Sequence, residues 1–488
     1  MNNLSLENIP EDLTPKYDPT KLGVGIVHIG LGAFHKAHQA ALTHQVLQKQ
    51  PGDWRIFGVS LRSSQPSAEL TPQDYLYTLI EKGMSGSRIK VIGSIAGAAC
   101  LIDDFDGVLS HLISDTTKIV SITVTEKAYG LDRANKGCDI AHPAIAHDLE
   151  NPENPIGVVG LLVLALKLRR KNGTEPFTVL CCDNLPENGV MIRNAVVDFA
   201  RRTEEELAAW ITDNVAFPST MVDRITPAAT SDTKQEARLE IGLTDNAAVE
   251  TEEFCQWVIE DNFPTGRPNW DIAGAVFTDN VTKFEMMKLR MLNGAHSMLA
   301  YVGFHCGYKY VRDVMRNEAL VQLIKRHMRS AQTTLDAIED VDFSLYAEDL
   351  IDRFRNPSIA HETFQIAMDG SEKMPQRIFD PAFSGKLSTE LKRSYVFATA
   401  AWLRHISGST HDCGKYILRD PISHKLLGID LMSGPNELAL QLEVIGLINK
   451  KAAADNAFWS DVNKLLEEML RYSMVDVVNN ETSRITIE

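Results

Sequence analysis

Long hydrophobic runs are missing from this 488-residue sequence. No run approaches the ~20 apolar residues that a membrane-spanning helix needs, and the first ten residues lack the basic start and apolar core of a secretory signal. Cysteine is scarce: there are seven, an odd number, with no CxxC pair. Scattered thiols of this kind are typical of a reducing compartment. We therefore expect a cytoplasmic protein that does not span a membrane.

Basic residues are also in short supply. The 49 Lys and Arg residues face 65 Asp and Glu residues, which gives a formal net charge of -16. An acidic surface disfavours nucleic acids and anionic membranes as partners, because both carry negative charge. A small anionic substrate stays compatible if Lys or Arg residues gather locally.

The length exceeds what one hydrophobic core fills, so we expect at least two domains.

The first motif is a glycine turn between a strand and a helix. The apolar run Val24–Gly30 leads into Gly32, and a helical pattern follows from about Phe34 to Gln48. This layout is typical of dinucleotide binding, because glycine lets a pyrophosphate approach and the helix start favours its charge. His35 stands where the third glycine of the full motif would be. Gly30-x-Gly32 alone is a weak signal, and a purely structural turn is the alternative.

Further apolar runs alternate with helical segments along the first half of the chain. The runs cover 54–61, 89–95, 118–124 and 177–182, and helical patterns include 156–170 and 190–206. This alternation predicts an α/β, Rossmann-like domain over residues 1–283 with a mainly parallel sheet.

Polar residues follow three of these runs, where ligands of such folds bind. They are Thr123–Lys127, Cys182–Gly189 and Arg62-Ser63-Ser64. Ordinary turn chemistry is the alternative for the first two. An acid at the position of Arg62 would mark NAD, so Arg62 either accepts the 2′-phosphate of NADP or is simply solvated.

Residues 284–488 are predicted to form a mainly α-helical domain. Amphipathic patterns cover 284–306, 309–338, 344–354, 387–406, 436–450 and 457–475, while 355–357 and 368–377 look like loops. The latter places Lys373 and Arg377 four residues apart around a proline, as a solvated loop or as a clamp for an anionic substrate.

The helix that begins at Phe284 carries a polar stripe. At about 100° per residue from Lys288, Glu285 lies at about 60°, His296 at about 80° and Asn293 at about 140°. One amine, one amide, one imidazole and one carboxylate thus share less than half of the helix surface. A surface helix with a Lys–Glu pair is the alternative interpretation.

Six motifs in order resemble one family, the polyol-specific long-chain dehydrogenases, also called the mannitol dehydrogenase family. The resemblance covers about residues 22–475, and its most specific motif is the last. The motifs are Gly30–Gln39, Thr125–Lys127, Cys182–Asn184, Met221–Arg224, Gln256–Asp261 and Lys288-x4-Asn293-x2-His296.

The resemblance implies a metal-independent dehydrogenase. It assigns Lys288 as the general acid/base, Asn184 and Asn293 as amides that hold the reacting oxygen, and His296 as the group that orients the adjacent hydroxyl. Glu285 is expected to gate a proton path. No third ligand of suitable spacing accompanies His35 and His38, so we expect no metal site.

The expected cofactor is NAD, with NADP possible because of Arg62. The cofactor-binding residues that we infer are Gly30, Gly32, Phe34, Arg62, Thr125, Asn184 and Asp223. Asp223 stands beside Arg224, and a structural ion pair is the alternative for these two residues.

The substrate is expected to be a small sugar acid or polyol. The region around Lys373 and Arg377 looks more like the fructuronate reductase branch, and Gln365 stands where mannitol dehydrogenases carry an arginine. His296 would complete this substrate site. The branch interconverts mannonate and fructuronate. A mannitol 2-dehydrogenase or another polyol dehydrogenase is the first alternative.

Alternatives of other classes are a nucleotide-sensing protein without turnover and a metal-dependent lyase or isomerase. We expect a monomer or a weak homo-oligomer, since family members are often monomers.

Overall fold

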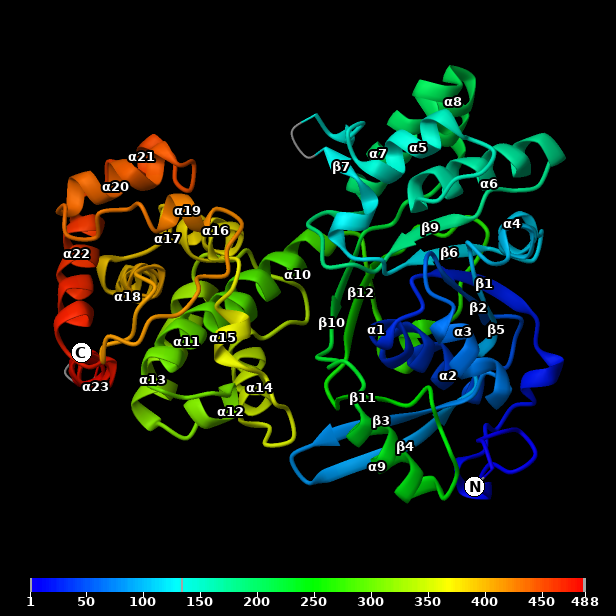
Figure 1. The fold of residues 1–488 in the computed structure, drawn as a ribbon, viewed down its shortest axis with the longest axis horizontal. Helices are drawn as coiled ribbons and strands as arrows, with labels where there is room; N and C mark the ends of the chain where they lie inside the picture. The colour runs from blue at the N-terminus through cyan, green and yellow to red at the C-terminus, as the bar shows by residue number, and fades with distance from the viewer. Residues whose placement is uncertain (1, 133–134, 486–488) are drawn as a thin grey trace. The chain divides into compact units, whose positions relative to one another are not determined.

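A computed structural model describes residues 2–132 and 135–485 of the chain (Figure 1). It contains two compact units, Met1–Thr282 and Lys283–Glu488. Within the described residues no helix is both long and apolar enough to cross a membrane.

Five parallel strands form the central sheet of the first unit. Their order is β5-β2-β1-β6-β9, and every neighbouring pair is parallel. The predicted apolar runs at 24–30, 54–61, 118–124 and 177–182 each contain one of these strands. The bounds are β1 Val24–Ile29, β2 Arg55–Ser60, β5 Ile95–Cys100, β6 Ile119–Ile122 and β9 Thr178–Cys181.

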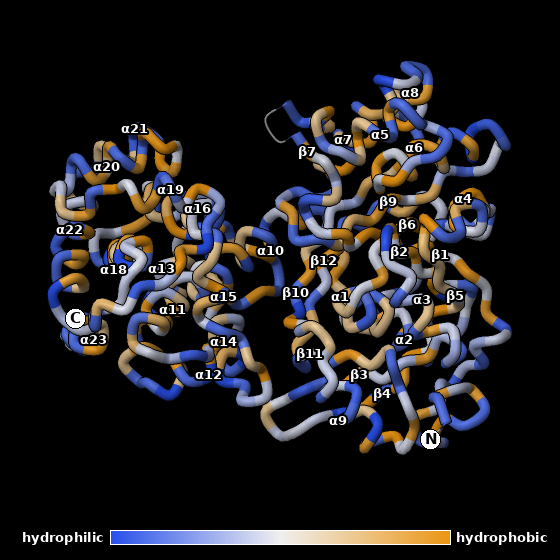
Figure 2. Tube along the Cα trace, viewed as in Figure 1, coloured by the Kyte–Doolittle hydropathy of each residue, from blue (hydrophilic) through white to orange (hydrophobic). Residues whose placement is uncertain are grey.

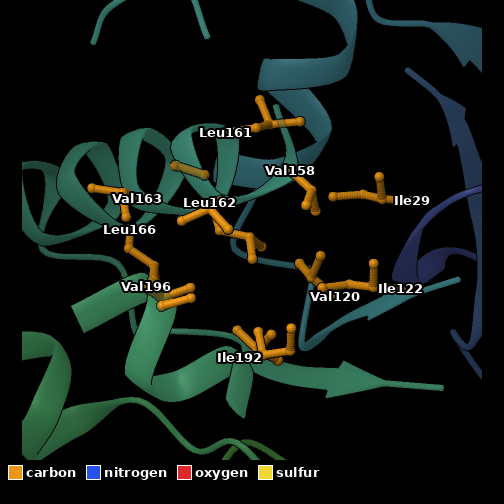
Figure 3. Packing of buried hydrophobic residues seen from close by; sticks show 14 of the residues in the cluster. Ile29, Val120, Ile122, Val158, Leu161, Leu162, Val163, Leu166, Ile192 and Val196 are labelled. Atoms are coloured by element: carbon orange, nitrogen blue, oxygen red, sulfur yellow. The ribbon is translucent and has the colours of Figure 1, made fainter. Parts of the chain in front are cut away.

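Helices cover both faces of this sheet. Successive side chains of a strand point to opposite faces, so strands that are apolar throughout must be covered on both sides. Ile29, Val120 and Ile122 pack on one face against Leu162 and other residues of α6 (Figure 3). This side is built by α4 Phe105–Ile113, α6 Val158–Asn172, α7 Asn188–Thr203 and α8 Glu205–Asn214. Along α6 the residues change from hydrophobic to hydrophilic towards its basic end (Figure 2).

The opposite face packs against the helices that follow the glycine turn. Ile26, Ile56 and Leu180 contact Ala40 and Trp270 in one cluster. The helices are α1 Ala33–Ala37, α2 Gln39–Lys49 and α3 Gln65–Leu70. With both faces covered, only the strand ends and the sheet edges can meet a ligand.

The remaining strands form smaller sheets. One contains β10 Thr220–Asp223, β12 Gln256–Glu260 and β13 Val276–Thr278, and another contains β3 Tyr77–Gly83, β4 Gly86–Ile92 and β11 Val249–Glu252. Strands β7 Leu131–Asp132 and β8 Gly137–Cys138 pair with each other, and α5 Pro143–Glu150 and α9 Ser231–Ile241 complete the longer helices.

The expectation that the run 89–95 belongs to the central sheet is wrong for most of its length. Its first residues lie in β4, antiparallel to β3, and only Ile95 begins β5. The physical reason is the tight turn between Gly83 and Gly86, where Gly86 has a φ of 131° that favours glycine.

The second unit is helical, as predicted. Its long helix α18 is buried from Ser394 to Ile406 and contacts α11, α13 and α22. The longer helices are α10 Val281–Met287, α11 Gly294–His305, α13 Glu318–Gln332, α14 Phe343–Arg355, α18 Thr389–Ile406, α20 Pro435–Val444, α22 Asn456–Arg471 and α23 Met474–Ile485. Short helices are α12 Val311–Val314, α15 Thr363–Ile366, α16 Gly370–Met374, α17 Asp380–Ala382, α19 Ser423–Leu426 and α21 Lys450–Ala453.

The predicted helix 309–338 is interrupted. The side chain of Asn317 accepts a hydrogen bond from the backbone N–H of Leu320 and starts α13 as a separate helix.

The stretch 368–377 is not a loop, contrary to the sequence prediction. It forms α16 and continues into a π-helix, Pro375–Phe379. The carboxylate of Asp420 accepts hydrogen bonds from Ser371 N (2.8 Å) and Ser371 Oγ (2.6 Å) and so stabilises the helix start. The glycine and proline signals are local, whereas this contact comes from 49 residues away.

Arg224 is buried, and it does not serve as the ion-pair partner of its neighbour Asp223. Its guanidinium donates to the backbone oxygens of Ala37 and Glu252 and pairs with Glu81 (Nη2 to Oε1, 2.9 Å). It therefore joins the end of α1 to the sheet that contains β3.

Arg224→Ala is expected to lower the free energy of unfolding by about 1–3 kcal/mol, because the buried backbone oxygens of Ala37 and Glu252 lose their donor while Glu81 keeps its pair with Lys90. Urea unfolding followed by tryptophan fluorescence measures the change. Arg201→Ala, which removes an exposed pair with Glu205, serves as the control and should cost less than about 1 kcal/mol. Equal effects of the two variants would contradict this structural role.

Candidate active site

The glycine turn lies at the carboxyl end of β1. Gly30 has a φ of 106°, and a Cβ there would lie 2.1 Å from Thr123 O, so no side chain fits. Gly32 is exposed, and a Cβ there would meet nothing closer than Gly30 O at 3.8 Å. The fold thus requires a glycine at position 30. At position 32 the absence of a side chain leaves space for a ligand to approach the protein backbone.

His35, at the position of the missing third glycine, is part of a buried histidine pair. Its ring stacks on His28 with 3.4 Å between centroids. Nε2 of His28 lies 3.1 Å from Gly30 O and 2.9 Å from Thr123 Oγ1. Burial lowers the pKa of His28 to about 3 and that of His35 well below its ordinary value, so both rings are neutral. The sequence analysis missed His28, whose only signal was a polar residue inside an apolar strand.

The polar segments after β6 and β9 are joined by Asp183. Its Oδ2 accepts hydrogen bonds from Val124 N (2.8 Å) and from the Tyr129 hydroxyl (2.6 Å). Thr125, which is exposed, has a φ of 79° and a ψ of 147°, a conformation that a β-branched residue rarely adopts. Asp183 therefore holds a strained segment at the strand ends. The sequence motif contained Asp183 but gave it no role.

Asn184 is exposed directly after this carboxylate. The next asparagine, Asn188, is buried and fixes the turn: its Nδ2 donates to Cys181 O (3.1 Å) and Thr220 O (2.9 Å), and its Oδ1 accepts from Thr220 N (2.8 Å). This ties β9 to β10, the strand that ends at the buried Asp223.

Two further predicted cofactor residues lie near the start of the unit. Arg62 is exposed just after β2, with Ser63 and Ser64 exposed beside it. Phe34 is half-buried in α1 and stacks on His38, with 5.0 Å between centroids.

In the second unit the polar stripe runs through a π-helix, Lys288–Asn293, between α10 and α11. The angles expected for a regular α-helix are therefore wrong. A π-turn is closed by i→i+5 bonds and contains more residues than an α-turn. Each residue turns through less than 100°, so Asn293 lies closer to the direction of Lys288 than about 140°. Lys288 is only 9% exposed, and Glu285 is half-buried one turn earlier.

His296 is 8% exposed and lies among aromatic and basic side chains. It stacks on Phe354 (4.4 Å between centroids) and meets His361 edge-on at 5.3 Å. Burial lowers its pKa well below the ordinary value, and the charges of Arg353, Arg377 and Lys373 lower it further. His296 is therefore neutral and able to exchange hydrogen bonds with a hydroxyl.

Lys373 and Arg377 have no carboxylate within 4.0 Å among residues 2–132 and 135–485. Lys373 Nζ donates to Ile366 O (3.1 Å) and Met368 O (2.5 Å). Arg377 Nη1 donates to Asn293 O (3.4 Å) and Ser297 Oγ (3.2 Å). Burial lowers the pKa of both groups, that of Arg377 to about 10. Cations placed in this way favour an anionic ligand.

Gln365 precedes Ile366, whose backbone oxygen accepts the hydrogen bond from Lys373. It is exposed on α15, and its side chain makes no hydrogen bond within the described part of the chain. The structure thus brings the charges of Lys373 and Arg377 close to His296. In the same described ranges, no group of three or more His, Cys, Asp and Glu side chains could hold a metal ion.

Comparisons with known proteins agree with the motifs. The family model of the mannitol dehydrogenase Rossmann domain matches residues 24–272, and that of the mannitol dehydrogenase C-terminal domain matches residues 280–470.

Relatives and solved structures match over most of the chain. D-mannonate oxidoreductase of Escherichia coli is 45% identical over 84% of this chain and 85% of its own. The oxidoreductase YeiQ of the same organism is 43% identical, over 87% and 88%. The ternary complex of Pseudomonas fluorescens mannitol 2-dehydrogenase with NAD and D-mannitol has a TM-score of 0.84 at 33% identity and covers 99% of this chain and 100% of that one. The predicted resemblance and fold class are confirmed, and the chain belongs to the mannitol dehydrogenase family of oxidoreductases.

Proposed function

We propose that the protein is an NAD(H)-dependent dehydrogenase that interconverts a sugar acid and its keto form, D-mannonate and D-fructuronate. The observation that carries the proposal is a pair of half-buried cations beside the neutral His296. These cations, Lys373 and Arg377, have no carboxylate within 4.0 Å among the described residues. A buried cation is costly without a counterion, and a substrate carboxylate would supply one. The 45% identity to a D-mannonate oxidoreductase supports the same substrate class.

The first unit would hold the nicotinamide cofactor, which supplies or accepts the hydride when bound. The open space at Gly32 and the strand-end position of the glycine turn fit a dinucleotide. The NAD complex of the mannitol 2-dehydrogenase relative supports this cofactor. The residues proposed to bind it are Gly30, Gly32, Phe34, Arg62, Thr125, Asn184 and Asp223.

Lys288 would act as the general base in the oxidation. Its neutral amine takes the proton of the substrate hydroxyl as the carbon loses its hydride, and it returns that proton in the reduction. The amides of Asn184 and Asn293 would donate hydrogen bonds to the oxygen as it gains negative charge, without a metal. His296 would orient the neighbouring hydroxyl, and Glu285 would gate a proton path to solvent.

A mannitol 2-dehydrogenase or another polyol dehydrogenase is the alternative within the family. The structural match to an enzyme solved with D-mannitol supports it. Lys373 and Arg377 favour the sugar acid, because a neutral polyol leaves both cations without a carboxylate in direct contact. A nucleotide sensor without turnover is disfavoured, because it has no need for a base such as Lys288.

Lys288→Ala is expected to lower kcat by about 10²–10⁴-fold, because the proton loses its acceptor. Binding of NADH, measured by fluorescence titration, should not change. Lys325→Ala, at an exposed position on α13, is the control and should keep full activity. Near-normal turnover of Lys288→Ala would refute its role.

The wild-type enzyme should reduce fructuronate with a far higher kcat/KM than fructose. Lys373→Met should lower kcat/KM for fructuronate by at least about tenfold, the effect of losing one charge-assisted hydrogen bond. The rate with fructose serves as the internal control, since damage to the fold lowers both rates alike. A preference for fructose would assign the protein to the mannitol branch.

Arg62 is expected to permit the use of NADPH. Arg62→Ala should raise KM for NADPH by about tenfold and leave KM for NADH unchanged, because only NADPH has a phosphate for the guanidinium. Initial rates with both cofactors measure this. Strict dependence of the wild type on NADH would show that Arg62 is merely solvated.

A further inference from the structure

The π-helix Lys288–Asn293 is held in place by contacts from outside it. A turn of this width is rare in proteins and often lies at functional sites. Near its middle, Arg290 Nη1 donates a hydrogen bond to Thr334 O (2.7 Å), just beyond the end of α13. At its end, Asn293 O accepts one from Arg377, a residue of the other π-helix, Pro375–Phe379.

Gly294, the first residue after the π-helix, is the point of closest packing. A Cβ there would lie 2.9 Å from His327 Nε2 and 3.3 Å from Arg377 O. The first distance is shorter than side chains tolerate, so a larger residue would displace either the imidazole or the helix. Glycine costs a helix interior roughly 1 kcal/mol relative to alanine, so its presence here has a packing reason.

His327 is a buried neighbour packed among other side chains. It is fully buried in α13, and its ring meets Tyr395 edge-on at 5.0 Å. Neither ring nitrogen has a hydrogen-bond partner within residues 2–132 and 135–485. Burial lowers its pKa to about 3, so the ring is uncharged. Burying a polar ring without a hydrogen bond costs free energy. The close packing of the His327 ring against Gly294 gives a reason why this residue is nevertheless present.

We propose that the contact between Gly294 and His327 sets the wide turn and thereby positions Lys288 and Asn293. This inference rests on the proposed function, in which the amine and the amide must reach the same substrate oxygen. The π-turn brings these two side chains closer in direction than an α-turn would. Neither Gly294 nor His327 has a role in the proposed chemistry, so His327 is a positioning residue and Gly294 provides the space for it.

The test begins with Gly294→Ala. Because a shift of about 1 Å can cost about 10²-fold in rate, kcat for fructuronate reduction should fall by about ten- to a hundredfold. The affinity for NADH, measured by fluorescence, should stay the same. The pH at which kcat/KM is half-maximal should also shift, because the surroundings of Lys288 change.

Gly303→Ala is the matched control. It places the same methyl group in the same helix, 2.5 Å from Val314 Cγ2, away from the π-turn. It should lower thermal stability, as Gly294→Ala does, but keep kcat and the pH profile. If both variants lose kcat in proportion to stability, the positioning role is overturned.

The double variant Gly294→Ala/His327→Ala decides which neighbour matters. Loss of the imidazole makes room for the methyl group, and the methyl group in turn fills part of the cavity. The double variant should therefore be more active than either single variant. If it is no more active than His327→Ala, the proposal is overturned, and this comparison holds even if Gly294→Ala alone does not fold.

Failure of the proposed function would look different. In that case the wild-type protein itself would reduce neither fructuronate nor fructose with NADH or NADPH. With an active wild type, the variants test only the positioning contact.

Discussion

A parallel sheet covered by helices on both faces constrains everything else in the first unit. Its strands are buried along their length, so chemistry can occur only where they end. The glycine turn after β1 and the polar segments after β6 and β9 lie at these ends. Their backbones must be held in place by hydrogen bonds with nearby side chains. His28 and Asp183 provide these hydrogen bonds and so fix the backbones of the turns.

In the second unit the constraint is the burial of charge. Lys373 and Arg377 are held by backbone oxygens and a hydroxyl, and neither has a carboxylate within 4.0 Å among the described residues. The charges of Asp369, Glu372 and Asp420 act on Lys373 only from farther away. The protein as a whole carries a net charge of -16. The local excess of positive charge at Lys373 and Arg377 therefore does not reflect the overall composition and is a property of the site. The neutral state of His296 follows from the same surroundings, since burial and nearby cations both disfavour a further charge.

Much of the fold could be predicted, because the decisive signals are local. Apolar runs bounded by glycine and polar residues marked β1, β2, β6 and β9, and amphipathic patterns marked the long helices. The errors have two causes, a distant contact that overrides local signals and a local turn that the sequence prediction did not use. The segment 368–377 is helical because Asp420 stabilises the helix start, and β4 leaves the central sheet because a tight turn pairs it with β3.

The sequence by itself determined which chemical groups are present and in what order. Six motifs in order, from Gly30–Gln39 to the Lys288, Asn293 and His296 spacing, were sufficient to indicate the family. Only the tertiary structure decided how these groups are presented. The wide turn at Lys288–Asn293 departs from regular helical geometry, and Gly294 at its end packs against His327, a residue 33 positions away. Packing also decides that Arg377 has no carboxylate beside it, because the spacing of residues along the sequence does not show which side chains surround a given residue in the fold.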